Sequence, residues 1–243
     1  MRRRPLALGD DTRHGDPGRG SRVTSSSMIT LRSGIALPTA AILLVLVVLA
    51  ACAPKAPPMA GAIAPASIPA TRLPPVHRKF VFLWNYADPD FRAKGDGAAR
   101  VAPPDSVRLD LFVGGGYGSG SAVLVDDRLV ARGSDRVRSY LPPAPFLWAA
   151  LGRLAVPPAP DTTARVDGDT LRVEIGSDPA WRATFAADRL LRIELIEGGR
   201  IQQWVARDSA GHVHYEHERA RRTLDLTVTR VDTVPAFDAA IWR

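Results

Sequence analysis

The residue with the clearest chemical role in this chain is its single cysteine, Cys52. An apolar run from Ala40 to Leu49 precedes it, and the small residues Ala50 and Ala51 lie directly before it. A run of this length is typical of an export signal, whose apolar region spans roughly 7–15 residues, whereas a membrane-spanning helix needs roughly 20. We therefore expect signal cleavage between Ala51 and Cys52. The alternative is an uncleaved anchor that extends back to Ile35.

The tetrapeptide Leu49-Ala50-Ala51-Cys52 resembles the lipobox of bacterial lipoproteins. The resemblance implies that Cys52 becomes the first residue of the mature protein. It would carry a diacylglycerol on its sulfur and an acyl chain such as palmitate on its amine, and two or more chains give lasting membrane attachment. Ala53 stands where an Asp would signal retention at the inner membrane, so the resemblance implies an outer-membrane lipoprotein that faces the periplasm.

Four stretches of different composition divide the chain. Residues 1–27 are rich in Arg, Gly, Asp and Ser without an apolar period, and we expect them to be untranslated or disordered. Residues 28–51, which begin at Met28, form the expected signal peptide. Residues 52–77 hold the lipidated cysteine and an Ala/Pro-rich tether, which cannot be helical or a central strand. Residues 78–243 form the expected domain.

Charge argues against a nucleic-acid partner. The net charge of +7 arises mostly before Cys52, and beyond it both signs are interspersed. A nucleic-acid-binding surface needs a clustered basic stripe, which the exported part lacks.

The remaining residue patterns do not predict an enzyme or a cofactor. There is no Gly-x-Ser-x-Gly elbow, and acylation of Cys52 leaves no thiol nucleophile. The paired carboxylates Asp126 and Asp127 fall in a turn. The stretch Gly114–Gly120 joins two expected strands, so it is interpreted as a hairpin loop rather than a phosphate cradle.

Three histidines, His212, His214 and His217, lie close together in the sequence. His212 and His214 share a strand face, but His217 points to the opposite face and no Cys or carboxylate completes a ligand shell. We expect a solvated strand and no metal site.

Alternation of apolar and polar residues predicts ten or eleven antiparallel strands in the domain. We expect them at Phe80–Tyr86, Phe91–Val101, Val107–Val113, Ser121–Val125, Arg128–Arg132, Leu171–Ile175, Trp181–Ala186, Leu191–Leu195, Arg200–Arg207, His212–Arg219 and Leu224–Val228. A helical period appears at Pro145–Leu154, and a short helical turn is expected at Phe237–Trp242. A meander of this length must curl, either into a closed filled barrel or into an open half-barrel lidded by the helix.

One expected strand is aromatic on one face, with Phe80, Phe82, Trp84 and Tyr86, and apolar on the other, with Val81 and Leu83. Such two-sided apolarity indicates a fully buried central strand. The alternative is that Phe82 and Trp84 line a ligand cavity together with Trp148 and Trp204.

The segment Phe91–Val101, followed by Pro103–Leu111, resembles an early hairpin of the LolA/LolB-type lipoprotein-sorting carriers and receptors. The resemblance implies an open antiparallel half-barrel with a short helical lid, an apolar cavity for acyl chains of lipids or lipoproteins, and no covalent chemistry. In the receptor a protruding loop meets the membrane. The matching loop here offers Tyr117 as its apolar candidate for contact with a membrane or partner.

We therefore expect a membrane-anchored, non-catalytic protein that binds acyl chains. The alternative is a structural or assembly lipoprotein of the envelope that holds a protein partner. The sequence does not predict an oligomeric state.

Overall fold

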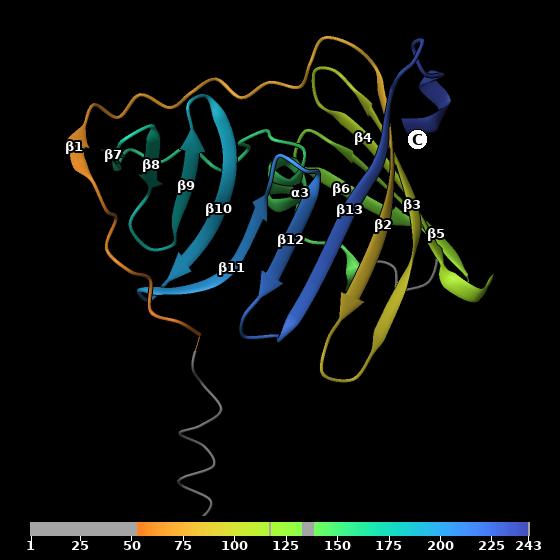
Figure 1. Ribbon diagram of the computed structural model, residues 1–243, viewed down its shortest axis with the longest axis horizontal. Coiled ribbons are helices and arrows are strands. Elements are labelled where there is room, and N and C mark those ends of the chain that lie inside the picture. Colours follow the sequence, from red (N-terminus) through yellow and green to blue (C-terminus); the bar gives the residue numbers. More distant parts are fainter. Residues whose placement is uncertain (1–52, 117, 133–138, 243) are drawn as a thin grey trace, which may run out of the picture. The chain divides into compact units, whose positions relative to one another are not determined.

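The computed structural model describes residues 53–116, 118–132 and 139–242. They form one sheet of 13 strands, in which every neighbouring pair is antiparallel, together with a short α-helix. Strands β1 and β6 stand at the two ends of the sheet, so within the described residues the sheet is not closed. The expected fold class, an open antiparallel half-barrel with a short helical lid, is confirmed, and the closed barrel is wrong (Figure 1).

Two meanders make up the sheet. The first contains β2 (Arg78–Ala87), β3 (Arg92–Ala102), β4 (Ser106–Val113), β5 (Ser119–Val125) and β6 (Arg128–Arg132). The second contains β7 (Thr162–Asp167), β8 (Thr170–Ile175), β9 (Ala180–Ala186), β10 (Arg189–Glu197), β11 (Arg200–Arg207), β12 (His212–His217) and β13 (Arg222–Thr233). Pairing of β13 with β2 joins them, and β1 (Ala62–Ala64) pairs with the outer edge of β7. Short 3-10 turns lie at Gly114–Gly116 and Ala239–Trp242.

Side-chain alternation in β2 explains why the sheet has one dry and one wet face. Phe82, Trp84 and Tyr86 point to the concave face and are buried, whereas Leu83 is 50% exposed on the convex face. The expectation of a strand buried on both faces is therefore wrong. Successive side chains in a strand point to opposite sides, and only the concave side has a covering layer over β2.

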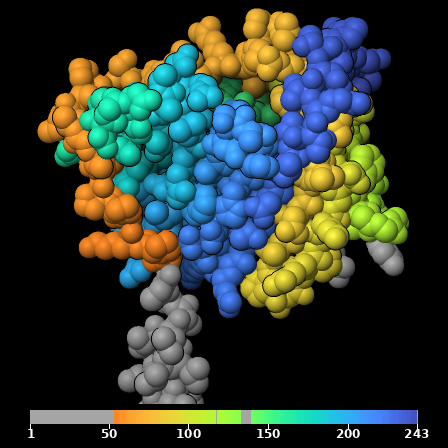
Figure 2. Space-filling view, viewed as in Figure 1, coloured from red at the N-terminus to blue at the C-terminus, as the bar shows by residue number. Residues whose placement is uncertain are grey.

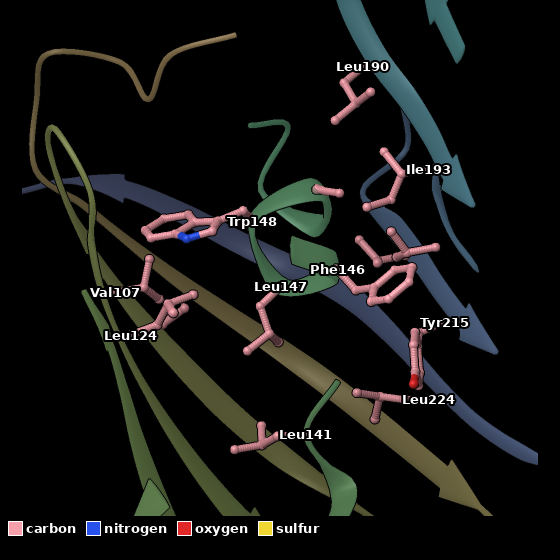
Figure 3. Close-up of a cluster of buried hydrophobic side chains, with 14 of the residues drawn as sticks. Val107, Leu124, Leu141, Phe146, Leu147, Trp148, Leu190, Ile193, Tyr215 and Leu224 are labelled. Atoms are coloured by element: carbon pink, nitrogen blue, oxygen red, sulfur yellow. The ribbon is translucent and has the colours of Figure 1, made fainter. Parts of the chain in front are cut away.

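The helix α3 (Ala144–Ala150) lies inside the curve of the sheet and packs against β10 and β11 (Figures 1 and 3). Pro145 stands in its first turn, where a missing backbone N–H breaks no helical hydrogen bond. Gly152 follows with φ of 86°, a left-handed conformation that ends helices. The helix is therefore shorter than the expected Pro145–Leu154. No described helix is long and apolar enough to cross a membrane.

The described Ala/Pro-rich segment, residues 53–77, packs on the domain and does not form a free spacer. The carbonyl of Pro54 accepts a hydrogen bond from Ile201 N at 3.0 Å, and that of Pro57 accepts one from Arg182 Nη1 at 2.7 Å. Leu73 is buried in the core. Proline lacks a backbone donor but keeps its carbonyl, so this segment can dock on the sheet as an acceptor.

Candidate ligand-binding cavity

A cavity of about 600 Å³ lies between the concave face of the sheet and α3. Its size is within the range of about 300–1,000 Å³ that is usual for small-molecule sites. The space-filling view shows a hollow at the upper edge of the domain, through which green atoms of the chain around α3 are visible (Figure 2). The walls are mainly apolar, with Phe80, Phe82, Trp84, Val101, Val107, Leu109, Leu111, Leu124, Leu190, Leu191, Val213, Leu224, Leu226 and Val228.

The aromatic side chains of β2 form one wall. Phe82 lies opposite Gly97 of β3, where a Cβ would stand 2.3 Å from the Phe82 ring. The glycine thus lets this ring lie across the neighbouring strand. Trp84 donates its Nε1–H to the carbonyl of Asp96 at 2.9 Å, so the indole can face the cavity without an unsatisfied donor.

Tyr140 also lines the cavity and packs against two further aromatic rings. The ring of Tyr140 lies 4.6 Å from that of Tyr86 and 5.8 Å from that of Phe91, measured between centroids. The Tyr86 hydroxyl donates to Asp88 Oδ2 at 2.8 Å. Burial, with a smaller contribution from this hydrogen bond, raises the pKa of Tyr86 to about 12. The phenol is therefore neutral at physiological pH.

The helix α3 covers the cavity with Leu147 and Ala150, but its tryptophan has a different role. Trp148 is buried, points toward β4 and β5, and donates its Nε1–H to the carbonyl of Asp126 at 2.5 Å (Figure 3). Phe146 points the other way and packs on Tyr215 at 5.5 Å. The prediction that Trp148 lines the cavity is wrong, since its ring anchors the lid.

The fourth predicted cavity residue, Trp204, lies on the opposite face of the sheet. Its neighbour Val205 is the buried, concave-facing residue of β11. The Trp204 ring packs under the Arg192 guanidinium, 3.9 Å from the ring centroid, and its Nε1–H donates to Glu218 at 3.2 Å. That prediction is wrong because the convex face also carries a covered apolar patch, beneath Ala56.

Three of the residues predicted to mark signal cleavage, attach a lipid or contact a membrane are not described by the structure. Ala51, Cys52 and Tyr117 lie outside the described residues. The described part of Gly114–Gly120 links the paired strands β4 and β5, as expected for a hairpin loop.

The histidines of β12 pair with carboxylates. His214 Nδ1 lies 2.6 Å from Asp225 Oδ1, and His212 Nδ1 lies 3.0 Å from Asp208 Oδ2. Burial lowers the pKa of His217. No group of three or more metal-ligating side chains occurs in the part of the chain that the structure describes.

Four arginines also line the cavity, Arg72, Arg78, Arg189 and Arg207, and the sequence did not predict them. They are spread over more than half of the domain, and no motif connects them. The antiparallel pairing of β10 with β11 brings the start of β10, which holds Arg189, near the end of β11, which holds Arg207.

Several solved structures are similar to this chain at low sequence identity. A LolA superfamily protein from Nitrosomonas europaea has 9% sequence identity and a TM-score of 0.48, with 73% of this chain and 98% of that chain covered. A putative outer membrane lipoprotein-sorting protein domain from Vibrio parahaemolyticus has 6% identity and a TM-score of 0.44, with 70% and 91% covered.

A DUF1329 family protein from Desulfovibrio piger has 10% identity to this chain and a TM-score of 0.37, with 69% and 89% covered. No protein-family model matches the sequence. No curated protein matches it.

Proposed function

We propose that this protein binds acyl chains of lipids or lipoproteins in the cavity under α3. The observation that carries the proposal is the apolar cavity itself, which the lid covers only in part. Hydrocarbon chains need no polar partner, and each buried methylene contributes about 0.8 kcal/mol. The hairpin that resembles lipoprotein-sorting proteins implies the same class of ligand.

The apolar side chains that line the cavity are incompletely buried, which supports a ligand site rather than a fully packed core. Phe80, Leu109, Leu226 and Val228 are only partly buried although they point to the concave face. Elsewhere on that face, Val173, Phe185 and Ile193 are 0% exposed. An acyl chain in the cavity would remove the remaining apolar surface from water.

The proposal includes a place for the protein in the cell. With Cys52 acylated, the domain would be held at a membrane of the cell envelope, which we propose is the outer membrane on its periplasmic side. Because residues 53–77 dock on the sheet, the domain would sit close to the bilayer. Its role there would be carriage or receipt of lipid without covalent chemistry.

Titration of the full chain with the neutral fluorophore N-phenyl-1-naphthylamine tests the proposal. The Cys52→Ser substitution would remove the protein's own acyl groups. We expect saturable binding at one site and displacement by monooleoylglycerol. Leu226→Trp, which fills the cavity from β13, should weaken binding about 10-fold or more, a loss of about 1.4 kcal/mol.

Leu83→Trp is the matched control. Leu83 lies on β2, next to β13, but its side chain is on the convex face. It should leave binding unchanged. Absence of saturable binding, or equal losses in the two variants, would contradict the proposal.

A further inference from the structure

The four cavity arginines lie at the same end of the strands, which is called the upper rim of the sheet below. Arg78 begins β2, Arg189 begins β10 and Arg207 ends β11, and neighbouring strands run in opposite directions. Arg72 belongs to the segment that passes over this upper rim before β2 (Figure 1). The apolar walls therefore lead to a mouth that carries guanidinium groups.

These guanidinium groups are not held in ion pairs by the described part of the protein. None of the four arginines forms an ion pair within the part of the chain that is described. Two carboxylates, Asp188 and Asp208, also line the mouth, and both residues are exposed. Asp208 is engaged by His212, through the backbone N–H at 2.9 Å and Nδ1 at 3.0 Å.

Arg207 is partly buried, whereas Arg72 and Arg189 are exposed. Its guanidinium lies against the end of α3, where a Cβ on Gly152 would stand 2.0 Å from Nη1. Burial, and then the like charge of Arg189, lower the pKa of Arg207. A guanidinium that is partly removed from water beside a like charge is destabilised unless an anion joins the two groups.

We propose that Arg189 and Arg207 bind the acidic headgroup of the ligand, so that the protein selects anionic amphiphiles whose chains fill the cavity. This inference rests on the proposed function and names its ligand class. A carboxylate or phosphate can accept two parallel hydrogen bonds from one guanidinium, and such charge-assisted bonds are about twice as strong as neutral ones. Arg72 and Arg78 add positive charge at the mouth.

The experiment compares two lipids with the same chain, oleoyl lysophosphatidate and monooleoylglycerol, each below its critical micelle concentration. Their affinities for the full chain with Cys52→Ser are measured by displacement of the neutral fluorophore. We expect lysophosphatidate to bind at least about 10-fold more tightly, with a preference that falls as salt is raised. Arg189→Gln with Arg207→Gln should reduce the preference to about 2-fold or less, through a loss of lysophosphatidate affinity that exceeds any loss of monooleoylglycerol affinity.

Arg219→Gln is the matched control, because this exposed arginine lies in the turn between β12 and β13, at the opposite end of the strands. This variant should keep the full preference for lysophosphatidate over monooleoylglycerol. Equal binding of the two lipids by the unsubstituted protein, or a preference that survives the double substitution, would overturn the headgroup site while leaving acyl binding intact. If neither lipid binds, the proposed function itself is contradicted.

Inorganic phosphate separates a lipid headgroup from a free anion. At millimolar concentration it should weaken lysophosphatidate binding modestly and monooleoylglycerol binding not at all. If phosphate alone binds as tightly as lysophosphatidate, the site serves a free anion and the proposal is wrong.

Discussion

Single side chains fix the position of the lid. Trp148 fills the space between α3 and the β4–β5 side of the sheet and donates to the Asp126 carbonyl, while Arg153 lies 4.5 Å above its ring. The lid is thus anchored by one indole on one side and by Phe146 on the other. The cavity depends on both anchors, because a lid that collapsed inward would fill it.

Truncation of Trp148 should therefore cost much more stability than truncation of Trp204. We expect Trp148→Ala to lower the free energy of unfolding by about 3–5 kcal/mol, since it empties a fully buried site. Trp148→Phe, which loses mainly the hydrogen bond, should cost about 1–2 kcal/mol. Urea denaturation followed by circular dichroism measures both. A Trp204→Ala variant that loses as much as Trp148→Ala would show that the lid anchor is misplaced.

The raised pKa of Tyr86 should make the folded protein less stable at alkaline pH. In the unfolded chain tyrosine ionises near pH 10, whereas the folded pKa is about 12. Between these values the unfolded state releases a proton that the folded state retains, so stability falls as pH rises from 10 toward 12. Tyr86→Phe should reduce this fall, which urea denaturation across that pH range measures. Some decline should remain, because burial also raises the pKa of Tyr215; an unaltered pH dependence would contradict the assignment.

Among the elements, β9 fixes the segment that leads into β1. Arg182 is 9% exposed and donates to Glu174 Oε2 at 2.7 Å and 3.0 Å and to the Pro57 carbonyl at 2.7 Å. A buried guanidinium of this kind needs each of its partners. It connects the Pro-rich segment to the convex face of the sheet.

Removal of this guanidinium should release the N-terminal edge. Arg182→Met is expected to lower the free energy of unfolding by about 3 kcal/mol and to increase amide exchange of residues 53–64. Hydrogen exchange with mass spectrometry locates the effect. Arg230→Met, on β13, is the control, since its side chain is 62% exposed, it pairs with Asp232 at 3.0 Å, and such pairs contribute about 0–1 kcal/mol. Equal exchange in the two variants would refute the anchoring role.

At the scale of the whole molecule, an unfilled cavity lowers the stability of the domain. A ligand that binds only the folded state at 100 times its dissociation constant adds about 2.7 kcal/mol. We therefore expect the delipidated protein to melt at a lower temperature, and Tm to rise with added lipid, as calorimetry can measure. Leu226→Trp should show a smaller rise than Leu83→Trp. A Tm that does not respond to lipid would contradict binding in the cavity.

Most strands could be predicted because their alternation is strong. All eleven expected strands are present, but β7 and β1 were not expected. In β7 the buried position is Ala164 and Val166 is 38% exposed, so the apolar signal is weak. In β1 the three residues Ala62–Ala64 lie among prolines and gain their order only from pairing with β7.

The cavity could be predicted only in part. Phe82 and Trp84 follow from the alternation in β2, since one face of the strand had to be covered. The faces of Trp148 and Trp204 depend on what covers each side of the sheet, and no local pattern contains that information. Likewise, the meeting of Arg189 and Arg207 is a consequence of strand register.

The pairing of β13 with β2 also governs when the domain can fold. Trp84 of β2 pairs with Leu226 of β13, two positions far apart in the chain, and such non-local contacts slow folding. While a ribosome synthesises the chain, β2 has no partner on one side until β13, the last strand of the sheet, has emerged. If the chain is exported as its leader predicts, we expect this delay to favour export before the domain has folded.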